Sequence, residues 1–116
     1  MPRYVILEHD HPVLHWDFML EAGDILRTWR LAAPPRLGQT IAAEMSFAHR
    51  LLYLDYEGPI SGNRGQVVRW DHGVFAWQED THTRIIVQLQ GERLQGTARL
   101  ERSAEEAWWL TVLVGE

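Results

Sequence analysis

A short stretch near the start of the chain contains side chains that bind metal ions, namely His9, His11, His15 and Asp17. Imidazole nitrogens and carboxylate oxygens together suit divalent ions such as manganese, iron and zinc. Three protein ligands leave coordination positions free for water or a substrate, so such a site can do chemistry. We therefore predict a divalent metal site at His9, His15 and Asp17, with His11 as a neighbour only.

These residues come together if the stretch forms the turn of a β-hairpin. Side chains alternate between the faces of a strand, so a strand at residues 14–21 places His15, Asp17 and Met19 on one face. His9 ends the preceding strand, predicted at residues 4–8, and can return beside His15. Any one histidine is most simply a surface residue, but the convergence of two histidines and an aspartate at one hairpin favours a site.

A second candidate group consists of His49 and Tyr53, which straddle the start of a strand predicted at residues 52–57. Imidazole can donate to a phosphate oxygen or act as a general acid, and a phenol adds another donor. Taken alone, the pair is better explained as a histidine at a strand end and a tyrosine in the core. Other polar residues are assigned to solvated ends or caps of strands: Asp55, Glu57, Asp71 and His72.

The rest of the chain shows an all-β pattern. Short apolar and β-branched runs predict further strands at residues 25–31, 41–47, 66–70, 74–78, 84–89, 94–99 and 108–114, separated by turn signals that include residues 71–73. Residues 39–52 contain helix formers, yet the strand interpretation is preferred. Closure into a barrel protects the edges of so many strands. We expect an all-β fold, a small distorted, closed or nearly closed β-barrel with short connecting loops.

Composition narrows the class of protein. The 116 residues predict one domain at residues 1–116, whose core takes most of the six tryptophans. The chain has no cysteine, which excludes disulfides and thiolate metal sites. No stretch has the length of a signal peptide or a membrane span, so we expect a cytoplasmic monomer without membrane association. The net charge of −5 disfavours a large nucleic-acid footprint.

The order of these motifs resembles the 3′-phosphoesterase domain of the bacterial end-joining DNA ligase D. That family's pattern is a strand, a histidine and, five residues later, His-aromatic-Asp-Phe-Arg-Leu-Glu; His9 and residues 15–21 follow it with one substitution. The resemblance covers nearly the whole chain and continues through Thr28-Trp29, Pro34-Pro35, His49 with Tyr53, Asp55-Tyr56-Glu57-Gly58, Trp70-Asp71-His72-Gly73, Leu94-Gln95-Gly96 and Trp109-Leu110.

The resemblance implies a compact barrel that uses manganese to remove a terminal ribonucleoside and then a 3′ phosphate from DNA or RNA. It implies that His9, His15 and Asp17 bind the metal, manganese first with zinc or iron as alternatives. It places His49 and Tyr53 at the scissile phosphate, where the ion and hydrogen bonds stabilise developing charge. The implied partners are a nucleic-acid 3′ end held by a small footprint, and a ligase or polymerase of non-homologous end joining.

Two departures from the family pattern affect the phosphate contacts. The family arginine that comes two residues after the metal-binding aspartate is Met19 here. A missing charge-assisted contact costs about 2 to 4 kcal/mol of transition-state stabilisation, or roughly 30- to 1000-fold in rate. The loop at residues 61–65 is also shorter than in the ligase-linked domains. The arginines that could replace the lost contact are Arg27, Arg30, Arg50 and Arg64.

Two alternatives to a phosphoesterase stay open at this point. The first is a catalytically impaired barrel that keeps the metal site and serves as an interaction module in DNA repair; Met19 and the acidic net charge favour it. The second is a non-haem iron oxygenase in which His15, Asp17 and His49 form the two-histidine, one-carboxylate face. The chain is small for an oxygenase that must also hold a cosubstrate, so an enzyme acting on phosphate esters is preferred.

Overall fold

The fold is a ring of antiparallel strands that begins with the predicted hairpin. A computed structural model describes residues 1–114, so Gly115 and Glu116, the last residues of the predicted domain, lie outside the described residues. In the hairpin, His9 is the direct cross-strand partner of His15, as expected. The strands are β1 (Arg3–His9), β2 (His15–Ala22), β3 (Ile25–Leu31), β4 (Thr40–Arg50), β5 (Gly58–Pro59), β6 (Gln66–Asp80), β7 (Arg84–Gly91), β8 (Gln95–Arg102) and β9 (Trp108–Val114).

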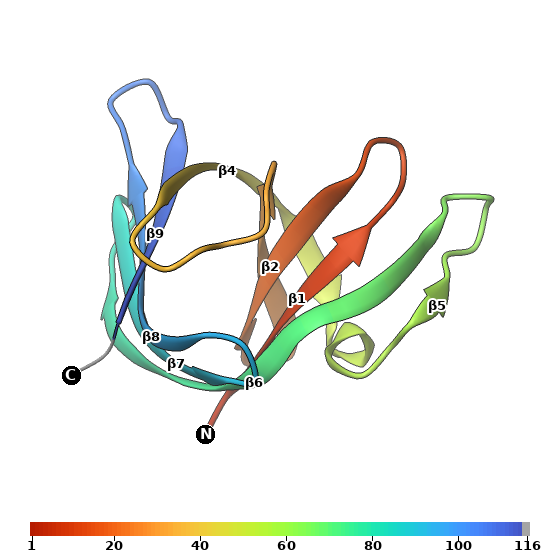
Figure 1. The fold of residues 1–116 in the computed structure, drawn as a ribbon, viewed down its shortest axis with the longest axis horizontal. Helices are drawn as coiled ribbons and strands as arrows, with labels where there is room; N and C mark the ends of the chain where they lie inside the picture. The colour runs from red at the N-terminus through yellow and green to blue at the C-terminus, as the bar shows by residue number, and fades with distance from the viewer. Residues whose placement is uncertain (115–116) are drawn as a thin grey trace.

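The ring runs in the order β1, β2, β3, β4, β9, β8, β7 and β6, and β6 pairs back with β1 to close it (Figure 1). The short strand β5 pairs with β6 outside the ring. This architecture confirms the expected all-β, distorted barrel, and β4 confirms the strand interpretation of residues 39–52 over Thr40–Arg50. Among residues 1–114, no helix has the length and apolar character needed to cross a membrane.

The strand predicted at residues 52–57 is wrong, because a 3-10 turn, η1 (Leu51–Leu54), occupies its first half. Side chains three residues apart face the same way in a 3-10 helix, which lets Leu51 and Leu54 pack on the same apolar surface. A strand would have turned one of them to solvent. Tyr53 therefore lies on η1 and not near the start of a strand.

The turn predicted at residues 71–73 is also wrong, because β6 runs through it as one continuous strand. Asp71 is fully buried and does not cap a strand end. Its carboxylate accepts hydrogen bonds from the Tyr4 hydroxyl at 2.6 Å and from the backbone N–H groups of Arg93 at 2.7 Å and Leu94 at 3.2 Å. Burial and this hydrogen bond raise the pKa of the Tyr4 phenol above its usual range. Gly91 leaves the space that the Tyr4–Asp71 pair occupies.

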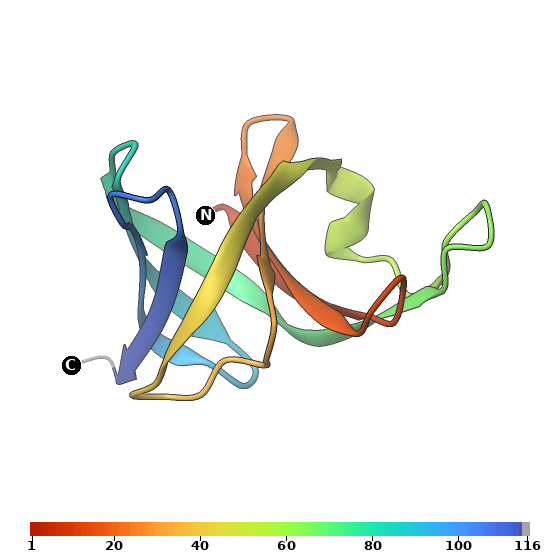
Figure 2. The ribbon, with the colours of Figure 1, turned by 90° about the horizontal axis from the view of Figure 1, so that it is seen from above.

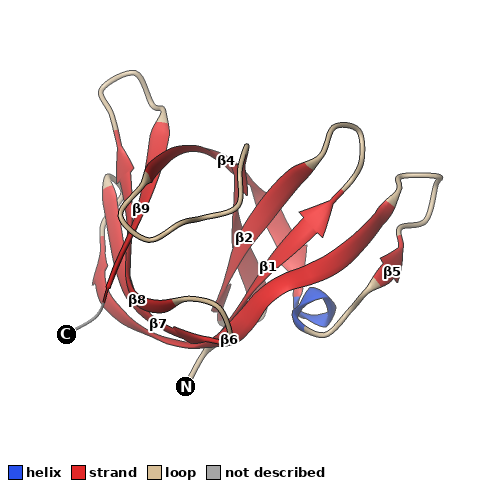
Figure 3. Ribbon diagram, viewed as in Figure 1, coloured by secondary structure: helices blue, strands red, loops and turns tan. Residues whose placement is uncertain are grey.

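Strands β1, β2 and β3 form a central wall that is buried on both faces. One face fills the ring with a barrel cluster that includes Tyr4, Phe18 and Trp29. The other face carries an outer cluster, made of Val5, Leu7, Met19, Leu26, Leu54 and Val67. Figures 2 and 3 show η1 and β5 on this outer side, away from β7, β8 and β9. The wall thus separates the ring from a second, smaller layer.

Replacing Asp71 by Asn tests the buried carboxylate. The amide puts a donor where the carboxylate accepts, so a buried N–H or O–H group loses its partner, which costs about 1–3 kcal/mol. Chemical denaturation should show the free energy of unfolding reduced by this amount. The control is Asp24→Asn in the exposed β2–β3 turn, where a change below about 0.5 kcal/mol is expected. Equal stability of the two variants would contradict the role assigned to Asp71.

Candidate functional site

A cavity of about 490 Å³ lies on the outer side of the central wall. Its lining includes four of the five predicted site residues, His9, Asp17, His49 and Tyr53. The fifth, His15, lines an adjoining cavity of about 330 Å³. The ends of β1, β2 and β4, together with η1, therefore bring to one place the residues that the sequence singled out in two separate groups.

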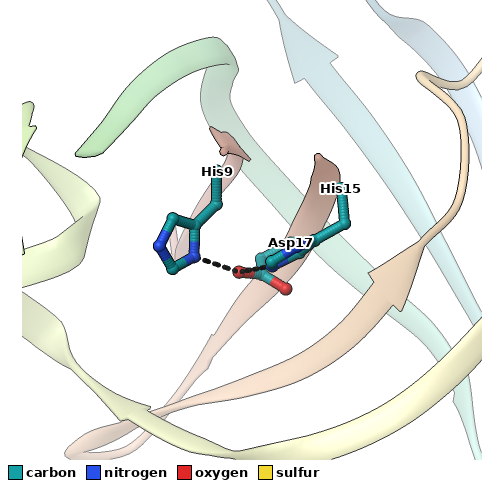
Figure 4. Close-up of side chains that lie close together, drawn as sticks. All are labelled: His9, His15 and Asp17. Atoms are coloured by element: carbon teal, nitrogen blue, oxygen red, sulfur yellow. Dashed lines mark hydrogen bonds and ion pairs between the residues drawn. The ribbon is translucent and has the colours of Figure 1, made fainter. Parts of the chain in front are cut away.

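His9, His15 and Asp17 converge at the edge of this cavity (Figure 4). One ligand atom from each residue lies within 4.8 Å of the others. Asp17 Oδ2 is 3.2 Å from His15 Nε2 and 3.9 Å from His9 Nδ1. His15 and Asp17 are buried, and His9 is half-buried. Alternation along β2 and the direct pairing of His9 with His15 produce this cluster, as the hairpin pattern predicts.

Backbone carbonyls fix which nitrogen of each imidazole faces Asp17. His15 Nδ1 lies 2.7 Å from the carbonyl oxygen of Val13, and His9 Nε2 lies 2.9 Å from that of Arg64. A carbonyl only accepts, so these nitrogens carry protons and the opposite nitrogen of each ring faces the Asp17 carboxylate. Two imidazole nitrogens and a carboxylate oxygen thus face one another, with His15 Nε2 within hydrogen-bond distance of Asp17. The donor set therefore fits a divalent metal ion held by three ligands whose orientation the backbone fixes.

His49 lies at the end of β4 and its ring is anchored through one nitrogen. Nδ1 donates to the carbonyl oxygen of Phe47 at 3.1 Å and lies 2.9 Å from Thr28 Oγ1, whose hydroxyl donates to Leu26. Nε2 makes no hydrogen bond within residues 1–114. Burial lowers the pKa of His49, and the nearby Asp17 carboxylate partly opposes this shift. The neutral ring therefore has a free lone pair on Nε2, beside the cavity.

Aromatic rings surround His49. The Phe47 ring stacks on it at 4.6 Å between centroids with 19° between the planes, and 72% of Phe47 is exposed. Tyr53 meets His49 edge-on at 5.8 Å and contacts Tyr56 in the same way. The sequence pattern identified His49 and Tyr53 but missed Phe47, which stands two residues before His49 and so shares its face of a strand.

The structure distinguishes the arginines that could compensate for Met19. Met19 itself is buried in the outer cluster, at the floor of the cavity. Arg27 lies elsewhere, paired with Asp80 at 3.1 Å. The Arg64 guanidinium is turned back onto Ser61 of its own loop, although its backbone holds His9. Arg30, Arg50 and Arg64 line the cavity and give it local positive charge in an acidic chain.

Most of the chain is similar in sequence to known proteins. Residues 7–102 match the DNA Ligase D 3′-phosphoesterase domain. The chain is 30% identical over 123 residues to the multifunctional non-homologous end joining protein LigD of Pseudomonas aeruginosa. It is 33% identical over 116 residues to the multifunctional non-homologous end joining DNA repair protein LigD of Mycobacterium tuberculosis. These alignments cover 95% and 90% of this chain but only 15% of each relative.

Proposed function

This chain belongs to the DNA ligase D 3′-phosphoesterase domain family, and we propose that it is a metal-dependent phosphoesterase acting on 3′ ends of DNA or RNA. It would remove a 3′ ribonucleoside or a 3′ phosphate during non-homologous end joining, beside a ligase or polymerase. One observation carries the proposal: His9, His15 and Asp17 direct three acceptor atoms to one point, next to a cavity that also holds His49 and Tyr53.

His9, His15 and Asp17 would hold the divalent ion, with manganese first and zinc or iron as alternatives. When bound, the ion would polarise a phosphate oxygen and stabilise the charge that develops on it. The carbonyl groups of Val13 and Arg64 keep both imidazoles in the tautomer that ligation needs. His49 is not part of this ligand group, which favours a phosphoesterase over the oxygenase arrangement of His15, Asp17 and His49.

His49 would act on the phosphate or on the attacking water through Nε2. In the neutral ring this atom can accept a proton from water, and in the protonated ring it donates to a phosphate oxygen. The contacts of Nδ1 with Phe47 and Thr28 hold the ring in place for either task. Tyr53 would add a hydroxyl donor from η1 on the same side of the cavity.

His15→Ala tests the metal site. It removes one of three ligands, so manganese binding measured by calorimetry should fall below detection, and turnover of a primer carrying a 3′ phosphate should be lost with it. His11→Ala is the matched control, because His11 comes from the same hairpin but is not in the ligand group. Full activity of the His15 variant would overturn the proposal. Stoichiometric manganese without turnover in the unaltered chain would favour the impaired interaction module.

His49→Ala separates a role in turnover from a role in metal binding. Losing a positioned acid–base group should lower kcat by about 10²- to 10⁴-fold while manganese affinity stays unchanged. Steady-state rates and calorimetry on the same preparation provide both numbers. His82→Ala, in the exposed β6–β7 turn, should match the unaltered chain. Loss of manganese from the His49 variant would instead make His49 a ligand and support the oxygenase arrangement.

Phe47→Ala tests whether the substrate is a nucleic acid. An exposed ring at the mouth of the cavity can stack on a terminal base, and a base stacked on an aromatic side chain contributes about 1–3 kcal/mol. The variant should therefore bind a 3′-phosphorylated oligonucleotide about 5- to 150-fold more weakly in fluorescence anisotropy. Hydrolysis of a small aryl phosphate should be unchanged. Met45→Ala, exposed on β4 but outside both cavities, is the control, and equal losses on both substrates would exclude base stacking.

A further inference from the structure

Arg30 occupies a position on β3 that the metal-binding hairpin brings next to the site. In the β2–β3 register Arg30 is the direct partner of Asp17, and Met19 is the partner of Thr28. Directly paired residues of an antiparallel sheet have their β-carbons about 4.5–5.5 Å apart and lie on the same face. Arg30 therefore starts beside the Asp17 carboxylate. It also lines both the main cavity and the adjoining one, so it stands at their junction.

Within residues 1–114, the guanidinium of Arg30 has no partner that accounts for its position. Among residues 1–114 it forms no ion pair, and its Nε is buried without a hydrogen-bond partner. Glu44, its cross-strand neighbour on β4, makes no ion pair with it either. Buried N–H donors are normally paired, and among the arginine Nε atoms that lack a partner within residues 1–114, that of Arg30 belongs to a side chain lining the cavity, where an acceptor from outside the chain can reach it.

The charge of Arg30 is felt weakly at His49. Its positive charge helps to lower the pKa of His49, behind the larger effect of burial. The remaining arginines near the site are less suitable, because Arg64 is engaged with Ser61 and Arg50 is exposed at the end of β4. Arg30 is thus the half-buried cation that starts beside Asp17 and lines the same cavity as His49.

We propose that Arg30 binds the phosphate of the substrate, supplying from β3 the cationic contact that the apolar Met19 does not supply from β2. This inference rests on the proposed function of the site. A guanidinium presents a planar fork of N–H donors that matches two oxygens of one phosphate group. The phosphate would then lie between this fork and His49, with the ligand group of His9, His15 and Asp17 beside it.

The test compares Arg30→Met, which keeps the length of the stem but removes the fork, with Arg27→Met on the opposite face of β3. The first readout is the affinity for inorganic phosphate in the presence of manganese, measured by calorimetry. The second is kcat/KM on an oligonucleotide with a 3′ phosphate. We expect the Arg30 variant to bind phosphate at least about 10-fold more weakly and to lose roughly 100-fold in kcat/KM. Arg27→Met should change neither value by more than about 3-fold.

Arg30→Lys keeps the charge without the fork, so it should retain the fold and fall between the unaltered chain and Arg30→Met. The inference would be overturned if phosphate affinity and kcat/KM of both Arg30 variants stayed within about 3-fold of the unaltered chain. That result would leave the proposed phosphoesterase function intact. Arg30-dependent phosphate binding without any turnover would support the inference and contradict the proposed phosphoesterase function. Manganese affinity unchanged in the variants would show that the loss arises at the phosphate and not at the metal.

Discussion

The burial of the central wall on both faces is the constraint on which the site depends. In the middle of β1 and β2, alternate residues such as Tyr4 and Phe18 belong to the barrel cluster, and the residues between them belong to the outer cluster or to the site. A shift of one residue in the register would turn His9 and Asp17 into the ring and expose the apolar partners. Packing of the outer cluster thus fixes the positions of His9, His15 and Asp17.

The parts of the site that follow from local alternation could be predicted from the sequence. The period of a strand places His15 and Asp17 on one face, and a tight hairpin returns His9 beside them. The continuity of β6 could not be predicted, because Asp71-His72-Gly73 has the composition of a turn. Only Tyr4 and the backbone of Arg93 and Leu94, distant in sequence, make a buried carboxylate at this position favourable.

Other features of the site leave little trace in residue types. The carbonyl groups of Val13 and Arg64 select the tautomers of His15 and His9, yet any residue carries a carbonyl, so no pattern could identify them. The spacing of His49 and Tyr53 indicated a site, but it did not indicate which element carries Tyr53. The apolar residues at 51, 52 and 54 fit either a strand or a 3-10 turn. Packing on Leu7 and Val5 decides in favour of the turn.

The net charge of −5 describes the surface and not the site. Several carboxylates are paired with arginines away from the cavity, as in Arg3–Asp55, Arg27–Asp80 and Arg84–Glu79. Charges farther than about 10 Å are largely screened at physiological salt, so the cavity responds mainly to its own residues. An arginine at position 19 would have its stem among the apolar residues of the outer cluster. Arg30 on β3, the cross-strand partner of Asp17, provides a cation at the cavity from another strand. Position 19 can therefore hold methionine, which fills the outer cluster without burying a charge.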